Sequence, residues 1–342
     1  MIMKRLAIRR FQMTALPIVL AGASVSLLAQ APPAEILRLD PAIDKIVPKG
    51  AKLEKVLGAL GFTEGPVWDR PGGFLLFSDV PNNAVMKYTP GATAAEPFRK
   101  PVFEGSFPKG AQIGSNGLAL DPQGRLVADE HANRRVTRRE KDGTIVVLAD
   151  RYEGKRLNSP NDVVVRNNGD IYFTDPPGYL RSYPPELPDK PQVDLDFNGV
   201  YRISAAGKLE LLTKDIPFPN GIALSPDEKK LYVGNSRPEK YWMVYDIKAD
   251  GGIANGRKFA DVTNEPGPGS PDGMKVDRRG NVYATALTGI QIFSPDGKRL
   301  GAITTPEIAS NCAWGDADGK TLYITARTGL YRIRLNIPGP VR

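Results

Sequence analysis

One pattern recurs six times between residues 64 and 335, and this repetition limits the fold more than any other feature of the 342-residue chain. Each copy starts with an acidic or amide residue, continues into a short apolar run, turns, and ends in a second apolar run. The six opening residues are Glu64, Asn116, Asn161, Asn220, Asp272 and Asn311. Their spacings of 52, 45, 59, 52 and 39 residues are typical of four-stranded propeller blades. The sequence therefore predicts an all-β, six-bladed β-propeller.

The two ends of the repeat array indicate how the ring closes. Residues 52–60 alternate like a β-strand but precede the first repeat, whereas the last repeat is one strand short. We expect this N-terminal strand to become the outer strand of the last blade, which hides two sheet edges. Residues 51–342 would then form a single propeller domain, preceded by an irregular leader over residues 32–50.

The first 31 residues read as a secretory signal peptide. They contain four basic residues and no acid, then an apolar stretch over residues 14–28 and the small-x-small sequence Ala29-Gln30-Ala31. The apolar stretch is short for a membrane span. We expect a periplasmic or secreted protein without stable membrane association after cleavage; an uncleaved N-terminal anchor is the alternative.

Charge and cysteine content exclude several classes of function. The formal charge of +8 falls to 8 − 4 = +4 without the signal peptide, which is too little to favour nucleic acid or anionic membranes. The single cysteine, Cys312, permits neither an internal disulfide nor a cysteine-based metal site. A small-molecule partner fits best, and the sequence leaves the oligomeric state open.

The opening residues are candidate metal ligands because equivalent positions of a propeller converge on its axis. One Asn-Gly or Asp-Gly pair is usually a turn, but six at equivalent positions favour a ring of oxygen donors. Glu64 and Asp272 would supply charge, and Asn161 and Asn220 would supply amide oxygens. This donor set suits Ca²⁺, with Mg²⁺ and Mn²⁺ as alternatives; Zn²⁺ is less suited because it prefers His and Cys.

The segments that follow each second apolar run should form the rim of the same mouth, where binding groups are usually carried. We therefore consider the rim residues His131, Asp175, Tyr179 and Asn235 as substrate-binding candidates. The opening residue Asn116 joins them, because it could face the substrate instead of the metal. His131 is the only histidine and is equally well explained as a hydrogen-bonded loop residue. The rim residues could equally stabilise their own loops, so both interpretations stay open.

Five motifs along the chain resemble one known family. They are Glu64-Gly-Pro-Val-Trp, Asn158-Ser-Pro-Asn161-Asp-Val, Phe173-Thr-Asp-Pro-Pro, Pro219-Asn220-Gly-Ile-Ala-Leu-Ser and Pro271-Asp272-Gly-Met. Together they are similar to the gluconolactonase branch of the SMP-30/gluconolactonase/LRE-like family. The resemblance implies a six-bladed propeller with an axial divalent metal, often calcium, held at positions 64, 161, 220 and 272. Asp272 would also be the catalytic base. Ser159 stands where animal members have a substrate-contacting arginine, so their substrate preference does not transfer.

The expected chemistry is hydrolysis of a sugar lactone such as D-glucono-1,5-lactone to the aldonic acid. The metal would polarise the carbonyl, and Asp272 would accept a proton from the attacking water. Two other functions use the same scaffold: a related metal-dependent esterase or organophosphate hydrolase, and a non-catalytic binding propeller with a structural ion.

Overall fold

The computed structural model describes residues 34–182, 187 and 191–340. The chain divides into two units, Met1–Ala31 and Pro32–Arg342. The predicted signal peptide lies outside the described residues, which all belong to the second unit. In the part of the chain that is described, no helix is long and apolar enough to cross a membrane.

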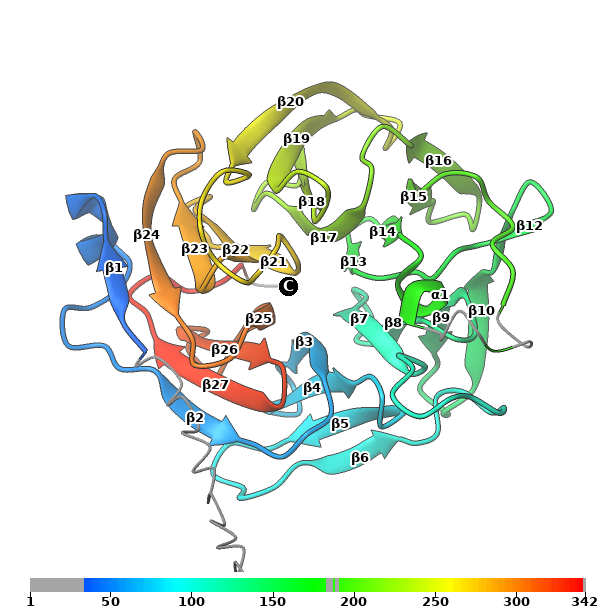
Figure 1. Cartoon of the computed structure of the whole chain (residues 1–342), viewed down its shortest axis with the longest axis horizontal. Helices are drawn as coiled ribbons and strands as arrows, with labels where there is room; N and C mark the ends of the chain where they lie inside the picture. The colour runs from blue at the N-terminus through cyan, green and yellow to red at the C-terminus, as the bar shows by residue number, and fades with distance from the viewer. Residues whose placement is uncertain (1–33, 183–186, 188–190, 341–342) are drawn as a thin grey trace, which may run out of the picture. The chain divides into compact units, whose positions relative to one another are not determined.

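The described residues form six antiparallel blades around an axis (Figure 1). Blades 1 to 3 contain β3 (Thr63–Asp69), β4 (Phe74–Asp79), β5 (Ala84–Tyr88) and β6 (Glu96–Arg99); β7 (Ser115–Leu120), β8 (Leu126–Glu130), β9 (Arg135–Arg139) and β10 (Ile145–Ala149); and β13 (Val163–Val165), β14 (Ile171–Asp175), β15 (Gly199–Ile203) and β16 (Leu209–Thr213). Blades 4 to 6 contain β17 (Pro219–Leu224), β18 (Lys230–Asn235), β19 (Tyr241–Ile247) and β20 (Ile253–Asp261); β21 (Met274–Val276), β22 (Val282–Ala286), β23 (Gly289–Phe293) and β24 (Arg299–Thr304); and β25 (Ala309–Gly315), β26 (Thr321–Ala326) and β27 (Gly329–Arg334). The predicted six-bladed propeller is confirmed.

The sixth blade is completed by the N-terminal strand, as predicted. Strand β2 (Glu54–Leu57) pairs antiparallel with β27, with Glu54 opposite Arg332 and Lys55 opposite Tyr331. The ring is thus closed by backbone hydrogen bonds between the two ends of the propeller, which pair the outer edge of β27.

The leader is not irregular, and that expectation is wrong. Strand β1 (Ile36–Arg38) pairs with β24 as a fifth strand of blade 5. The 3-10 helix η1 (Pro41–Lys45) follows, capped by Asp40, and it buries Ile43 completely between blades 5 and 6. The edge of β24 offers free backbone groups, and η1 covers apolar surface, so the segment gains structure from the propeller.

The hydrophobic core is a ring of clusters between neighbouring blades. Val127 and Phe173 belong to the cluster between blades 2 and 3, and Leu75 and Tyr323 to the cluster that joins blades 1 and 6. Strands β14 and β26 are buried along their whole length because a blade lies on each face. This burial explains why the second run of each repeat is continuously apolar instead of alternating.

Each second strand returns to the mouth at which the inner strand begins. Ser115 lies opposite Glu130 at the start of β7, and Pro219 lies opposite Asn235 at the start of β17. We call this end of the axial channel the upper mouth and the end reached by the last residues of the inner strands the lower mouth. Besides η1, three short elements of the described residues lie outside the blade sheets: β11 (Arg151–Tyr152), β12 (Lys155–Arg156) and α1 (Gly178–Ser182), the last in the rim loop between β14 and β15.

Candidate active site

The opening residues stand where the regular ladders of the inner strands are interrupted. The register shifts between Glu64 and Val67 in β3, and between Pro219 and Ile222 in β17. Strands β13 and β21 begin only after Asn161 and Asp272. Such irregularities release a side chain from the alternation of the strand and are common beside active sites. The interruptions therefore collect side chains at the upper mouth that a regular strand would distribute over both faces.

Glycines after the opening residues let neighbouring inner strands touch. A Cβ atom on Gly221 would lie 1.9 Å from the carbonyl oxygen of Asp272, and one on Gly65 would lie 2.0 Å from that of Asn116. No larger residue fits at either position. The Asn-Gly and Asp-Gly pairs are thus places of close backbone approach around the axis, which is a different use of glycine from a hairpin turn.

Hydroxyl groups on second strands hold the inner strand of the next blade. Ser78 Oγ donates to the carbonyl oxygen of Asn116 at 2.8 Å, and Thr174 Oγ1 donates to that of Asn220 at 2.7 Å. All four residues are buried. These bonds fix the backbone of a candidate ligand from the neighbouring blade, so the site is built on strands and not on flexible loops.

Two carboxyl groups share the channel at the upper mouth. Glu64 is 2% exposed, and its Oε2 accepts from the backbone N–H of Gly65 at 2.5 Å and from Asn311 Nδ2 at 3.0 Å. Burial raises the pKa of Glu64 well above its usual value, and the charge of Asp272 adds to the rise. Burial also raises the pKa of Asp272, with a further contribution from Asp162 and an opposing one from contacts with Glu64 and Asn220. Two such acids are stabilised in their charged form by a cation placed between them.

Amide oxygens complete a donor set at the same mouth. Asn220 Nδ2 donates to Ser236 Oγ at 3.0 Å, while the buried Asn220 Oδ1 has no partner among the described residues. The backbone of Asn161 is fixed by bonds to Thr174 and Gly117 at 2.8 and 2.7 Å. In the described ranges, no cluster of three or more His, Cys, Asp or Glu side chains is arranged to hold a metal. The predicted ligands Glu64, Asp272, Asn161 and Asn220 together offer two carboxylates and two amides, which would be a donor set for a hard ion such as Ca²⁺.

Asp162, Lys275 and Asn311 lie below the ring of predicted ligands, on the side of the lower mouth. Of these three, Asp162 and Lys275 were not predicted from the sequence as site residues. Asp162 is buried, and its oxygens accept from the N–H groups of Val163 at 3.0 Å and Ile222 at 3.2 Å. Burial raises the pKa of Asp162, and the charge of Lys275 opposes the rise. Lys275 Nζ donates to Asn311 Oδ1 at 3.1 Å. A signal was present, since Asp162 follows Asn161 directly and Lys275 interrupts the apolar run of an inner strand.

Asn116 and His131 form a pair beside the acids. Asn116 Nδ2 and His131 Nε2 are 3.0 Å apart, and the ring is completely buried. Burial lowers the pKa of His131 to about 4, partly opposed by the backbone of Gln112. The imidazole is thus neutral at physiological pH. Asn116 Oδ1 is buried without a described partner, so it is the polar atom of this pair that is free to accept a hydrogen bond.

Asp175 and Tyr179 hold the rim loop of blade 3. The two carboxyl oxygens of Asp175 accept from the N–H groups of Asn158 and Ser159 at 2.8 and 2.7 Å, and Asp175 is completely buried. The N–H group of Tyr179 donates to Ser159 Oγ at 3.0 Å, and Tyr179 is 4% exposed. For Asp175 these bonds agree with the loop-stabilising alternative, and a sugar contact by this residue stays a prediction. Tyr179 as a substrate contact stays a prediction.

Asn235 also agrees with the loop-stabilising alternative. Its Oδ1 accepts from the N–H group of Phe218 at 2.8 Å, its Nδ2 donates to the carbonyl oxygen of Glu239 at 2.7 Å, and it is completely buried. The amide therefore fixes the rim of blade 4 and presents no free polar atom to a substrate.

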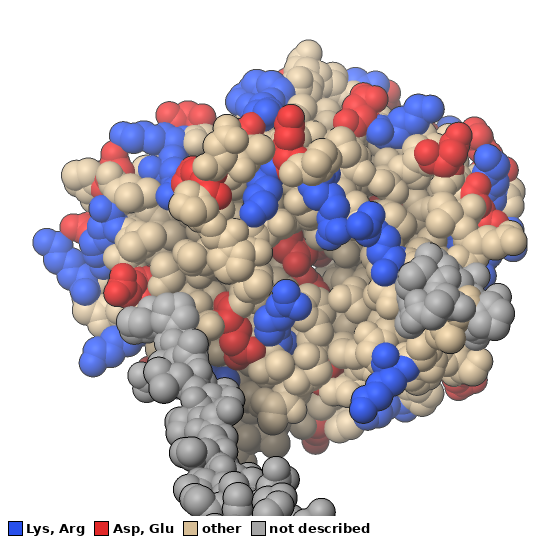
Figure 2. Space-filling model, viewed as in Figure 1, with Lys and Arg blue, Asp and Glu red and all other residues tan. Residues whose placement is uncertain are grey.

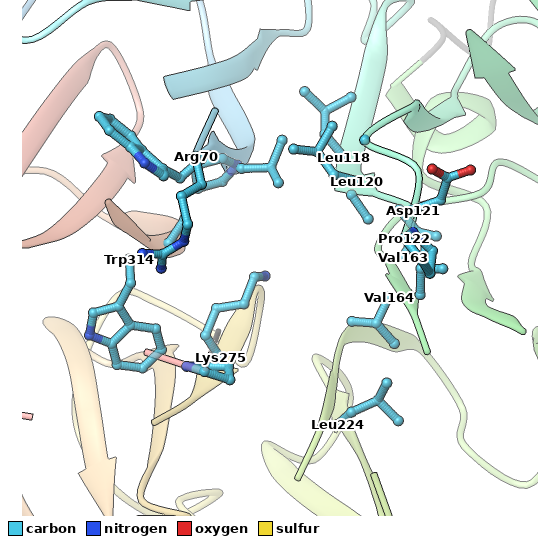
Figure 3. A pocket seen from close by; sticks show the side chains of 18 of the residues that line it. Arg70, Leu118, Leu120, Asp121, Pro122, Val163, Val164, Leu224, Lys275 and Trp314 are labelled. Carbon is cyan, nitrogen blue, oxygen red and sulfur yellow. The ribbon is translucent and has the colours of Figure 1, made fainter. Parts of the chain in front are cut away.

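The two mouths of the channel differ in character. At the upper mouth, acidic side chains lie in a central hollow that is surrounded by Lys and Arg (Figure 2). The lower mouth holds a cavity of about 420 Å³ whose lining includes Leu118, Val163, Leu224 and Trp314 (Figure 3). This lining offers few polar groups. The candidate active site is therefore the upper mouth and not the lower cavity.

Comparison with known proteins agrees with this architecture. Residues 62–328 match the SMP-30/Gluconolactonase/LRE-like region. The chain is 36% identical over 315 residues to a gluconolactonase of Zymomonas mobilis, which covers 88% of this chain and 86% of that protein. A gluconolactonase of Xanthomonas campestris has a similar structure, with a TM-score of 0.75 and 32% identity over 90% of this chain and 99% of that one.

A more distant relative acts on another class of lactone. The pentonolactonase XacC of Haloferax volcanii is 26% identical over 275 residues, which covers 78% of this chain and 81% of that protein. These relatives are lactonases by name, and their similarity extends over most of the propeller. The chain belongs to the SMP-30/gluconolactonase/LRE-like family and is a lactonase.

Proposed function

We propose that the chain is a metal-dependent lactonase, with calcium as the ion and a sugar lactone such as D-glucono-1,5-lactone as the substrate. The observation that supports the metal is the pair of acids, the buried Glu64 and the half-buried Asp272, next to the unpartnered Asn220 Oδ1. The names of the relatives support the lactone. Calcium is preferred because the donors are oxygens of mixed charge, which Ca²⁺ tolerates at variable coordination.

Glu64, Asn161, Asn220 and Asp272 would hold the ion. When bound, a divalent cation supplies positive charge that polarises the lactone carbonyl and stabilises the oxyanion. It also stabilises the ionised form of both acids, which burial disfavours.

Asp272 is the proposed general base. It is half-buried and open to the channel, unlike the enclosed Glu64, and its backbone N–H donates to Thr285 Oγ1 at 3.1 Å. The Asp272 carboxylate accepts a proton from water as the water attacks the lactone carbonyl. The bond from the carbonyl carbon to the ring oxygen then breaks, and the protonated Asp272 returns the proton to the ring oxygen, which leaves as the alcohol of the aldonic acid. Such assistance contributes about 10²–10⁴-fold to a rate.

Asn116 and His131 are proposed to orient the substrate. Asn116 Oδ1 can accept a hydrogen bond from a sugar hydroxyl, and the neutral His131 fixes the direction of the amide. His131 is then a positioning residue, because its ring has no exposed surface. We also propose that residues 1–31 direct export to the periplasm or the medium, on the composition of that segment alone.

The test is lactone hydrolysis by protein stripped with a chelator and then titrated with Ca²⁺, Mg²⁺, Mn²⁺ or Zn²⁺. We expect one ion, Ca²⁺, to restore turnover of D-glucono-1,5-lactone. Asp272→Asn should reduce kcat by about 10²-fold or more while the protein stays folded. Asp250→Asn is the control, since Asp250 is exposed in a turn far from the channel lining.

Three outcomes would overturn parts of this proposal. Full turnover after metal removal would exclude metal dependence, and full turnover of Asp272→Asn with metal bound would exclude the base. Ion binding without turnover of any lactone or ester would favour a binding propeller with a structural ion.

A further inference from the structure

Three arginines surround the upper mouth, each on a different rim segment. Arg181 lies in α1 of blade 3, Arg237 follows β18 of blade 4, and Arg327 lies in the turn between β26 and β27 of blade 6. All three are exposed. The rim segments are those to which the second strands return, so the three side chains are carried by the same face as the candidate ligands.

Unlike many other arginines, these three have no acidic partner among the described residues. Arg202 pairs with Asp170 at 2.9 Å, and Arg334 pairs with Asp318 at 2.6 Å. For Arg181, Arg237 and Arg327, no ion pair is formed with any carboxylate of residues 34–182, 187 and 191–340. Their positive charge is therefore not neutralised within the described part of the protein.

Aromatic rings, instead of carboxylates, hold the three guanidinium groups. Arg237 Cζ lies 4.3 Å and Arg181 Cζ lies 5.8 Å from the centre of the Phe218 ring. Arg327 Cζ lies 5.6 Å from the centre of the Phe62 ring. A guanidinium that packs on a ring keeps its N–H donors free at its edge, where they can bind a planar oxyanion with two hydrogen bonds.

The guanidinium groups of Arg181 and Arg237 repel each other when no anion lies between them. Both groups pack on the Phe218 ring. The pKa of Arg237 is lowered mainly by burial and further by the charge of Arg181, while the charge of Asp272 opposes this shift. Phe218 is itself fixed, because its N–H group donates to Asn235 Oδ1 at 2.8 Å. An anion between the two guanidinium groups would relieve their repulsion without rearranging the rim.

Under the proposed function, the acids Glu64 and Asp272 do not neutralise the positive charge of the rim arginines. Asp272 interacts electrostatically with Arg237 and Arg327, so the arginines lie within range of the site. With a divalent cation on Glu64 and Asp272, the two carboxylates are already neutralised. The positive charge of the rim is then available to the substrate.

We propose that Arg181 and Arg237, packed on Phe218, bind an anionic group of the substrate. The substrate class is a sugar lactone with a carboxylate, phosphate or sulfonate at the end remote from the lactone carbonyl. This inference rests on the proposed lactonase function and narrows its substrate.

The test compares lactones that are matched in ring size and differ in charge. D-Glucono-1,5-lactone is compared with its 6-phosphate, and D-glucono-1,4-lactone with D-glucaro-1,4-lactone, which carries a carboxylate. We expect kcat/KM at low salt to be at least about 10-fold higher for the charged member of one pair, which also identifies the anion. This preference should shrink as ionic strength rises.

Variants assign the preference to the two arginines. The double variant Arg181→Gln and Arg237→Gln should lower kcat/KM for the charged lactone by about 10- to 100-fold and for the neutral lactone by a much smaller factor. The matched double variant Arg181→Lys and Arg237→Lys should retain part of the preference for the charged lactone, since the positive charge remains but the planar guanidinium group is lost. Arg70→Gln removes a charge at the lower mouth and should leave the ratio unchanged.

Two results would overturn this inference while the lactonase function stands: neutral lactones hydrolysed as well as charged ones by the wild type, or an equal loss on both substrates in the folded double glutamine variant. Hydrolysis of neither class, with Ca²⁺ bound, would overturn the proposed function and this inference together. The melting temperature of each variant shows that it is folded.

Discussion

The two mouths of the channel are built from the same six inner strands, yet their side chains differ in kind. At the upper mouth, ladder interruptions and glycines bring Glu64, Asp272 and Asn220 together. At the lower mouth the strands are regular, and apolar side chains such as Val163 and Leu224 line the cavity.

This difference shows how a repeated fold produces one reactive end. A regular strand alternates its side chains between the faces of a blade, and in a propeller both faces are buried against neighbours. The opening residues converge on the axis where the alternation stops, whereas Lys275 reaches the channel from the regular strand β21. The chemistry is therefore expected at the end with the interrupted ladders, and substitutions at both mouths can test whether the lower one is as inert as its lining indicates.

Removing an acid should have the largest effect, and only at the upper mouth. Glu64→Gln removes a buried charge of the proposed cation site and should weaken Ca²⁺ binding and lactone turnover by at least about 10-fold each. Asp121→Asn removes an acid that lines the lower cavity and should change neither. Isothermal titration calorimetry and steady-state kinetics measure the two quantities. If Glu64→Gln and Asp121→Asn lost Ca²⁺ affinity and lactone turnover equally, the two mouths would not differ in function.

A methyl group should be tolerated at the lower mouth and not at the upper one. Gly221→Ala places a Cβ against the carbonyl oxygen of Asp272 and should lower the free energy of unfolding by about 3 kcal/mol. It should also reduce kcat, because Asp272 must move. Gly124→Ala meets no atom within 4 Å, and its φ of +73° should cost about 1 kcal/mol with no change in kcat. Denaturant unfolding measures both changes in the free energy of unfolding. A loss of less than about 1 kcal/mol for Gly221→Ala would contradict the close approach of Gly221 to the carbonyl oxygen of Asp272.

His131 should make stability depend on pH in the acid range. Its pKa of about 4 in the folded protein lies below the ordinary value of 6.5, so between these values the unfolded chain binds a proton that the folded one does not. Its contribution is complete above pH 6.5 and is lost as the pH falls toward 4, by about 3 kcal/mol. His131→Gln should flatten this part of the unfolding curve. An unchanged slope would show that the histidine does not cause it.

The smallest effect is expected at the lower cavity. Leu120 is half-buried in its lining, and Leu120→Ala should lower the free energy of unfolding by about 1 kcal/mol because part of its surface is already exposed. Lactone kinetics should be unchanged. A fall in kcat/KM would show that the lower cavity communicates with the site.

Much of the architecture could be predicted because it depends on neighbours in the sequence. The turn residues and apolar runs repeat at blade spacing, and they located the inner strands and the upper mouth. The missing strand of the last repeat placed β2 beside β27. The leader could not be predicted, since β1 finds its partner β24 far along the chain, with Ile36 opposite Ile303.

The candidate site was predicted only in part, for a similar reason. The sequence by itself determined the repeat, the closure of the ring and the polar residues that open each inner strand, because hydrophobic pattern and turn chemistry are local. The tertiary structure alone decided which polar groups face one another. It turned Asp175 and Asn235 inward to hold loops, brought Asp162 and Lys275 under the ring, and left Arg181 and Arg237 without an acid among the described residues. Those outcomes depend on contacts between blades, where residues distant in sequence meet and where hydrogen bonds already made determine which atoms remain free.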